Sequence, residues 1–456
     1  MSSSALAGLF ALNALYLICG LVLLWLVRGF ATWLELARLA GLAYFVGLSG
    51  VGLAWTLLLI AGAPFGGWTI VVVPVAIVAG SSLLARRVGR ALPGRPQIDV
   101  RRTHFVAAVG IAATGVFFEA LFRASRLAGV YWWDAWSFWL PKAKALYHFG
   151  EIDVHFFTTL PGPSYPPLIP VLDAAAFHAM GGTDVVTLHV QYWLFGVAFV
   201  WGLAGLLAER TPAWILWPFV LVALVAPRIG RHMFVSEADL FLDFLFVLAA
   251  VLVAYWLHDR ARWQLVVATL LMSGMVMTKR EGLLLAAVVV VAALVASARE
   301  WRYTAPRIGL SALAVVAVAL PWRVWYLANG AEGEGAGAEL VPDTGRLWPS
   351  LRLAFDVLFS SGYWSVAVAA MVGALVLGLV VESYRLAAFF GVLVTLVTLG
   401  GGWFTWAIED LPITQEAEAN PIVRYMGAAA LACVAAGPLL LAAAWRGANA
   451  KDGGTA

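Results

Sequence analysis

Charged side chains are scarce in this sequence, and several of them gather in one stretch, Tyr131–Pro167. The stretch reads YWWDAWSFWLPKAKALYHFGEIDVHFFTTLPGPSYPP and directly follows an apolar segment. Asp134 supplies a carboxylate, which can serve as a general base when a reacting proton lies within hydrogen-bond reach. Lys142 and Lys144 supply compact ammonium groups that suit phosphate oxygens. The stretch is therefore the first candidate for a chemical site.

Two further clusters of ionisable residues interrupt apolar sequence later in the chain. The first consists of Arg228, Arg231, His232, Glu237 and Asp239, and the second of Lys279, Arg280 and Glu281. Ionisable groups at membrane depth are costly unless they are paired or lie in a cavity, so such clusters indicate a shared polar site. The alternative is that each side chain reaches the membrane surface or forms a local ion pair.

Lysine usage supports the shared site. The chain has four lysines, and three of them, Lys142, Lys144 and Lys279, lie in these clusters. The remaining basic positions are almost all arginine, so lysine at these places indicates a need for a compact cation. Chance placement is the alternative explanation.

The composition identifies the class of protein. Of 456 residues, 62% are apolar and 12% are charged, which far exceeds the apolar content of a soluble domain. Cys19 and Cys433 lie inside apolar segments, so we expect neither a disulfide nor a cysteine metal site. The net charge of +3 is small, and the arginines gather in loops, which sets orientation rather than nucleic-acid binding. We predict an all-α, multi-pass protein of the cell membrane.

About thirteen transmembrane helices are expected, because apolar segments long enough to cross a core of about 30 Å recur from end to end. They cover approximately residues 5–27, 39–61, 68–85, 104–122, 184–207, 214–226, 240–257, 265–277, 282–296, 309–327, 366–381, 386–406 and 422–445. The apolar segment 167–180 is short, so we expect it to lie along the membrane as an amphipathic juxtamembrane helix.

Arginine placement predicts the orientation. Six arginines between residues 86 and 102 mark a cytoplasmic loop. The N-terminus and the first external loop (123–183) then lie outside, and the C-terminus is cytoplasmic. We divide the chain into a three-span extension with that basic loop (1–103), a central module (104–327), and a flexible Gly- and Glu-rich external loop with the C-terminal spans (328–456).

The first external loop resembles that of a known family. Asp134 just after a span, the KAKAL sequence Lys142–Leu146, Gly150 and the YPPL sequence Tyr165–Leu168 are similar to the first external loop of GT-C glycosyltransferases. The most similar branch contains the protein O-mannosyltransferases and aminoarabinose transferases. The resemblance covers most of the chain from about Phe105 onward and does not include the first three spans. It implies that residues 104–327 are a GT-C-like catalytic module.

Later segments carry the same resemblance. Ser236–Asp239, which follows Pro227, is similar to the second acidic motif of the family. The TKREG sequence at Thr278–Gly282 is similar to a lysine-bearing segment of the family. Arg424-Tyr425 is similar to an Arg-Tyr pair near the start of a late span.

Two positions depart from the pattern. Ala135 follows Asp134 where the branch often has a second acid, and Tyr165 stands where many members carry lysine.

The resemblance implies transfer of a sugar from a polyprenyl-phosphate donor to an extracytoplasmic acceptor, which would be a cell-envelope glycan, a lipid or a protein. Asp134 would take the acceptor proton, and a single displacement would invert the anomeric carbon. The departing phosphate needs positive charge nearby. The residues expected to bind substrate are Glu237, Asp239, Lys142, Lys144, Tyr165, Arg228, Arg231, His232, Lys279, Arg280 and Arg424.

Glu237 and Asp239 have three possible roles. They could bind sugar hydroxyls or orient the acceptor, they could hold Mg²⁺ or Mn²⁺ together with Asp134, or they could cap the following helix. The branch is considered metal-independent, so the resemblance favours the first role, with no metal site and no cofactor.

A secondary transporter or flippase of lipid-linked sugars is the main alternative, and a noncatalytic assembly subunit is another. Transporters typically show internal repeats and broken helices near the middle of the membrane. The sequence shows no convincing repeat, and its charged clusters fall on one predicted side. Membrane lipid is an expected partner in every case, and whether a protein partner exists is left open.

Overall fold

The computed structural model describes residues 1–96, 102–125, 129–130, 132–232, 235–329, 344–359, 364, 366–380, 384–407 and 421–452. These residues form helices joined by turns, with one isolated bridge between Thr32 and Gly94 and no strand among them. The all-α fold class is therefore confirmed. Most of the predicted Gly- and Glu-rich loop lies outside the described residues.

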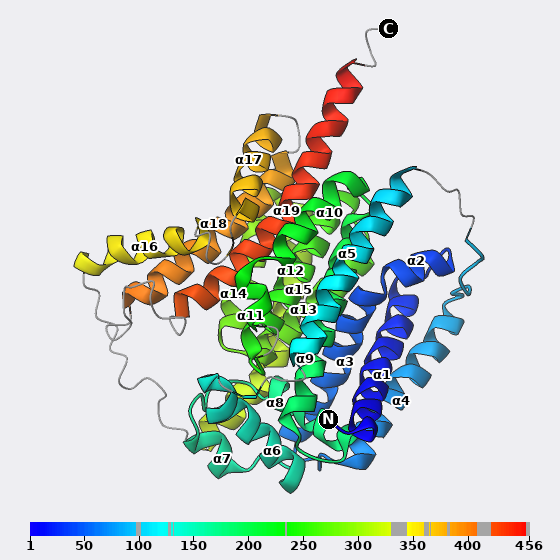
Figure 1. The fold of residues 1–456 in the computed structure, drawn as a ribbon, viewed down its shortest axis with the longest axis vertical. Helices are drawn as coiled ribbons and strands as arrows, with labels where there is room; N and C mark the ends of the chain where they lie inside the picture. Colours follow the sequence, from blue (N-terminus) through cyan, green and yellow to red (C-terminus); the bar gives the residue numbers. More distant parts are fainter. Residues whose placement is uncertain are drawn as a thin grey trace.

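The helices are labelled in chain order (Figure 1). They are α1 (Ser3–Val27), α2 (Trp33–Arg38), α3 (Ala40–Ile60), α4 (Gly67–Arg87), α5 (Arg102–Ser125), the π-helix η1 (Ala135–Trp139), α6 (Leu140–Phe149), α7 (Val154–Thr159), α8 (Leu168–Met180), α9 (Val185–Leu207), α10 (Ala213–Leu224), α11 (Pro227–His232), α12 (Ala238–Asp259), α13 (Arg262–Thr278), α14 (Glu281–Ala296), the 3₁₀ turn η2 (Ala298–Glu300), α15 (Trp301–Ala328), α16 (Thr344–Phe359), α17 (Val366–Val380), α18 (Tyr384–Ala407) and α19 (Pro421–Asp452).

All thirteen predicted spans fall on helices, but the structure corrects their lengths. In the described part of the chain, 9 helices are long and apolar enough to cross a membrane, namely α1, α3, α4, α5, α9, α12, α15, α18 and α19. The other four, α10, α13, α14 and α17, have 12, 17, 16 and 15 residues. A helix rises about 1.5 Å per residue, so the shortest of them reaches only about 18 Å. The chain is thus a multi-pass helical membrane protein with nine candidate spans.

Helix α12 lies at the centre of the bundle (Figure 1). Its apolar residues cover every face, and such a helix is stable only when it is surrounded. It packs against α9, α13, α14 and α19, and every residue of its most apolar window is buried.

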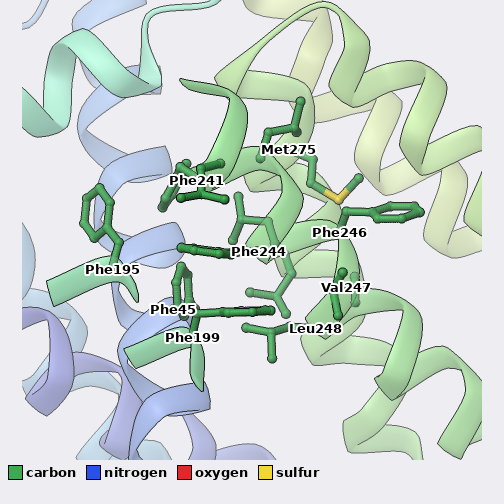
Figure 2. Packing of buried hydrophobic residues seen from close by; sticks show 14 of the residues in the cluster. Phe45, Phe195, Phe199, Phe241, Phe244, Phe246, Val247, Leu248 and Met275 are labelled. Carbon is green, nitrogen blue, oxygen red and sulfur yellow. The ribbon is translucent and has the colours of Figure 1, made fainter. Parts of the chain in front are cut away.

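Aromatic rings fill the space between α3, α9 and α12 (Figure 2). Phe199 of α9 stacks on Phe244 of α12 with 4.1 Å between ring centroids. Phe45 of α3 contacts both Phe241 and Phe244 of α12. This packing fixes the start of α12, which carries two of the predicted acids.

The N-terminal helices are closely packed into this bundle. A Cβ atom on Gly20 of α1 would lie 1.6 Å from the carbonyl oxygen of Ala43, and one on Gly47 of α3 would lie 1.8 Å from that of Tyr16. Small residues let membrane helices approach to this distance. Helix α3 in turn packs against α8, α9 and α13, and α1 packs against α8 and α9, so the first two spans contact the central module directly.

Helix α8 differs from its prediction. We expected segment 167–180 to lie along the membrane, but every residue of α8 except His178 and Ala179 is buried. It packs against α1, α3, α6, α9 and α13. Its apolar residues surround the helix instead of forming one stripe, and such a helix lies inside protein.

Helix α16 was not predicted from the sequence. Its buried residues are Ser350, Leu353, Ala354, Val357 and Leu358, which recur at the spacing of one helical face. This face packs against α17, α18 and α19. The helix is amphipathic, so a search for long apolar runs does not find it.

The two ends of the bundle differ. Figure 1 places the N-terminus at the end that carries α6, α7 and α8, and the C-terminal end of α19 at the opposite end. The sequence predicts that the N-terminus and loop 123–183 lie on one side of the membrane and the C-terminus on the other. The positions of the N-terminus, of α6 to α8 and of the end of α19 agree with that prediction. Which end faces the cytoplasm stays a prediction from the arginine distribution.

Candidate functional site

An ion pair joins Asp134 to Arg424, a residue far away in the sequence. Asp134 lies directly before η1, is 6% exposed, and its Oδ2 accepts a hydrogen bond from Nη1 of Arg424 in the first turn of α19. Burial raises the pKa of Asp134 above its ordinary value, and the positive charge of Arg424 opposes that effect. A buried carboxylate of this kind holds a proton more readily than an exposed one.

Arg424 is shared between three carboxylates. Its Nη1 lies 3.5 Å from Oδ2 of Asp239 and 3.9 Å from Oε2 of Glu237, in addition to its bond with Asp134. Glu237 and Asp239 occupy the N-terminal cap and first turn of α12, where the positive end of the helix dipole favours acids. One guanidinium therefore connects the turn before η1, α12 and α19.

Lys279 extends this network toward α14. It lies between α13 and α14, is 1% exposed, and its Nζ is 2.7 Å from Oδ1 of Asp239 and 3.6 Å from Oε1 of Glu281. Burial lowers the pKa of Lys279, but the carboxylates of Asp239 and Glu281 raise it by more, so the ammonium stays charged. We call Asp134, Glu237, Asp239, Lys279, Glu281 and Arg424 the central cluster.

Two tyrosines border the central cluster. Tyr425 donates a hydrogen bond to Glu281 at 2.9 Å. The ring of Tyr165 stacks on the ring of Trp139. Nζ of Lys279 and Cζ of Arg280 lie over the Tyr165 ring, at 5.4 Å and 5.1 Å from its centroid. Cations are attracted to an aromatic face, so Tyr165 helps to hold these two side chains in place. Burial raises the pKa of Tyr165 to about 12, so it is a neutral phenol at physiological pH.

His232 joins the cluster through Glu237. Its Nδ1 lies 2.5 Å from Oε1 of Glu237, and its ring packs edge-on against Trp132. Arg228 and Arg231 belong to the same short helix, α11, but their side chains lie outside the described residues.

Lys142 has a different kind of partner. It is 1% exposed, and its Nζ donates hydrogen bonds to the carbonyl oxygens of Gly162 at 2.6 Å and Pro161 at 3.3 Å. The ammonium thus fastens the loop that leads to Tyr165. Lys144 is half-buried on α6, and no ion pair joins it to the central cluster in the described part of the chain.

A cavity opens beside the central cluster, between α12, α14, α18 and α19. Its volume is about 80 Å³. Its polar lining consists of Asp239, Asp243, Glu281, Arg424 and Tyr425, and its apolar lining of Leu242, Leu284, Leu285, Val288, Leu396, Val397, Gly400, Gly401 and Ala428. The shape and lining suit a ligand with a charged group at one end and a hydrocarbon chain at the other.

The acids of the cluster also offer ligands for a metal ion. One oxygen from each of Asp134, Glu237 and Asp239 lies within 4.8 Å of the other two, and all three residues are buried. Oxygen atoms grouped in this way suit hard divalent cations.

The three charged segments identified in the sequence therefore meet at one place. Asp134, Glu237, Asp239, Lys279 and Arg424 are joined by ion pairs. Tyr165 contacts Lys279, His232 contacts Glu237, and Arg280 lies over the ring of Tyr165. Three residues that complete the site, Glu281, Tyr425 and Asp243, are absent from the set predicted to bind substrate. Each has a signal in the sequence, since Glu281 and Tyr425 adjoin predicted residues and Asp243 lies one helical turn from Asp239.

Comparison of the chain with protein-family models, with curated proteins and with solved structures finds no match in any of the three.

Proposed function

We propose that this protein is a GT-C-type glycosyltransferase that moves a sugar from a polyprenyl-phosphate donor to an acceptor outside the cytoplasm. The observation that supports it best is the ion-paired cluster of Asp134, Asp239, Arg424 and Lys279, two members of which, Asp239 and Arg424, line a largely apolar cavity. A base and two buried cations are the groups that this transfer requires. The motif resemblance in the first external loop and at Arg424-Tyr425 adds independent support.

The cavity suits the donor. Leucine and valine side chains from α12, α14 and α18 offer an apolar wall for the lipid chain, and Arg424 lines the same cavity. A polyprenyl phosphate has the same division into a long hydrocarbon and an anionic group. Arg424 and Lys279 are its expected phosphate contacts, because buried cations attract a phosphate strongly in a low-dielectric surrounding.

The proposed reaction is one displacement. The acceptor oxygen or nitrogen forms a bond to the anomeric carbon while the bond from that carbon to the phosphate oxygen breaks. Asp134 takes the acceptor proton, and the polyprenyl phosphate leaves with the bonding electrons. Phosphate is a good leaving group, so no second carboxylic acid has to protonate it, unlike in glycoside hydrolysis. Attack opposite the leaving group inverts the anomeric carbon.

The donor is identified by incubating the purified protein with a panel of polyprenyl-phosphate sugars. We expect one donor to raise the thermal unfolding temperature, because a ligand that binds only the folded state stabilises it. The same donor should release its sugar to acceptor in membrane extracts. Arg424→Gln should lose both effects.

Glu119→Gln is the matched control. Glu119 lies on α5, has a half-exposed side chain and pairs with Arg123 one turn away. This variant should keep both effects. Movement of a lipid-linked sugar across vesicles with the sugar still attached would instead identify a flippase and contradict the proposal.

A further inference from the structure

We propose that the end of α4 and the loop after it form a binding surface for an anionic phospholipid. Three exposed arginines, Arg86, Arg87 and Arg95, supply its charge, and the exposed side chains of Trp33 and Leu92 supply its apolar part. We call these five residues the basic surface. It precedes the part of the chain that the family resemblance covers, and its function as a lipid site does not rest on the proposed transfer reaction.

The loop after α4 is fastened to the ends of α1 and α2. The guanidinium of Arg90 donates hydrogen bonds to the carbonyl oxygens of residues 26–28, at the C-terminal end of α1. The carbonyl oxygen of Gly94 accepts a hydrogen bond from the amide of Trp33 at 3.1 Å, and its own amide donates one to Ala31 at 2.9 Å. Carbonyl groups at a helix end need donors, and Arg90 provides them. The loop is therefore held at a fixed place against the bundle.

The charges of the basic surface are not compensated within the described part of the chain. No ion pair there joins any of its three arginines to a carboxylate, whereas Arg28 and Arg38 on the neighbouring helices pair with Glu35 and Glu209. The dipole of α4 favours positive charge in its last turn, where two of the three arginines lie. It does not reach Arg95 in the loop. An anion from outside the chain is the expected partner of all three.

Apolar side chains beside the arginines indicate that this anion belongs to a lipid. Trp33 at the start of α2 is 51% exposed, and Leu92 in the loop is 74% exposed. A free phosphate would leave both of them in water, whereas a phospholipid places its acyl chains against them and its phosphate against the guanidinium groups. Tryptophan is also typical of the border between a membrane and water.

The position of the basic surface suits the anionic leaflet of a membrane. Figure 1 shows α2 and the end of α4 together at the edge of the bundle, away from the end that carries α6 and α7. The arginine distribution predicts that this side faces the cytoplasm, where anionic lipids attract basic segments next to a span. Selectivity should depend on the net charge of the headgroup, because neutral phospholipids also carry a phosphate.

Native mass spectrometry of the purified full-length protein in mild detergent tests the surface by measuring the Kd of the first phospholipid bound. We expect phosphatidylglycerol to bind at least about fivefold more tightly than phosphatidylcholine with the same acyl chains. Arg86→Gln combined with Arg87→Gln should weaken phosphatidylglycerol binding about 25-fold, since each arginine near an anionic lipid contributes about fivefold. Arg95→Gln alone should weaken it about fivefold, which covers the case that the double variant fails to fold.

Arg299→Gln combined with Arg302→Gln is the matched control. Both side chains are exposed, and the double variant removes the same net charge from the same predicted side of the membrane. It should bind phosphatidylglycerol as wild type does. Equal weakening in the two double variants would show a general effect of charge and overturn the site. Equal Kd values for the two lipids, or displacement of phosphatidylglycerol by inorganic phosphate at the same concentration, would also overturn it.

Discussion

Lys142 and Lys279 are both 1% exposed, yet their ammonium groups have partners of different chemistry. Lys279 is bound by the carboxylates of Asp239 and Glu281, whereas Lys142 is bound by the carbonyl oxygens of Pro161 and Gly162. Carbonyl groups accept the hydrogen bonds of an ammonium, which holds the backbone that carries them in place. Lys142 therefore stabilises the loop before Tyr165, and Lys279 belongs to the charged site.

Replacing each lysine by methionine should separate these roles. Lys142→Met should lower stability by about 1–3 kcal/mol, because the buried carbonyl of Gly162 loses its donor. The transfer rate per folded molecule should stay close to wild type. Lys279→Met should abolish transfer, because Asp239 loses its nearer cation and the phosphate loses a contact. Thermal unfolding and transfer assays on both variants check this, and equal loss of transfer in the two would contradict the distinction.

The proposed base also predicts a pH dependence. Burial raises the pKa of Asp134 above its ordinary value of 3.8. A general base works only when ionised, so the transfer rate should rise with pH through this raised pKa. The acid limb of the kcat/KM profile should therefore lie above pH 3.8. A limb at or below that value would show that the titrating group is not the buried Asp134.

At the residue level the sequence predicts the members of the site better than their partners. The scarcity of charge in an apolar chain singles out Asp134, Glu237, Asp239 and Lys279. Arg424 is found only through the family resemblance, because its ion pair with Asp134 joins residues 290 positions apart. No local pattern encodes such a contact, and the same holds for the carbonyl partners of Lys142.

At the level of helices, the contact of α1 with α3 depends on glycine. A Cβ on Gly47 would collide with the backbone oxygen of Tyr16, whereas one on Gly80 of α4 would meet nothing within 4 Å. Gly47→Ala should therefore lower stability by about 1–3 kcal/mol through overpacking. Gly80→Ala should raise it by about 0.5–1 kcal/mol, because alanine is the better helix former. Thermal unfolding of the two variants checks the pair, and equal shifts would show that α1 and α3 are not so close.

The helices themselves were largely predictable. Long apolar runs identify all thirteen expected segments, because the backbone of a membrane segment must satisfy its own hydrogen bonds. Length was less predictable, since charged residues at Lys279, Arg280 and Glu281 separate α13 from α14 and leave both short. Burial of α8 depends on which helices surround it, and α16 is amphipathic, so neither follows from hydropathy alone.

At the level of the whole molecule, ion pairs also tie together the end opposite the site. Arg28 pairs with Glu35 at 2.5 Å and Arg38 with Glu209 at 2.5 Å. Arg210 pairs with Asp259, and both Arg260 and Arg385 pair with Glu300. These contacts link α1, α2, α9, α12 and α18 where the sequence predicts the cytoplasmic loops. The abundance of arginine there agrees with the positive-inside rule.

Cysteine labelling tests the predicted orientation. Both native cysteines, Cys19 and Cys433, are fully buried, so background labelling should be low. Trp136 beside Asp134 and Arg87 at the end of α4 are exposed. A membrane-impermeant maleimide should label Trp136→Cys in intact cells, and Arg87→Cys only after the membrane is opened. The reverse result would place the candidate site on the cytoplasmic side.

The transfer rate of Asp134→Asn tests the central claim most directly. The variant and Glu119→Gln are compared with wild type in vesicles of the same lipid, with the donor that the thermal screen identifies. We predict that Asp134→Asn lowers the rate by about 10²–10⁴-fold, the usual contribution of a general base, while the donor still raises its unfolding temperature. Glu119→Gln should match wild type. A rate for Asp134→Asn equal to that of wild type would contradict the account.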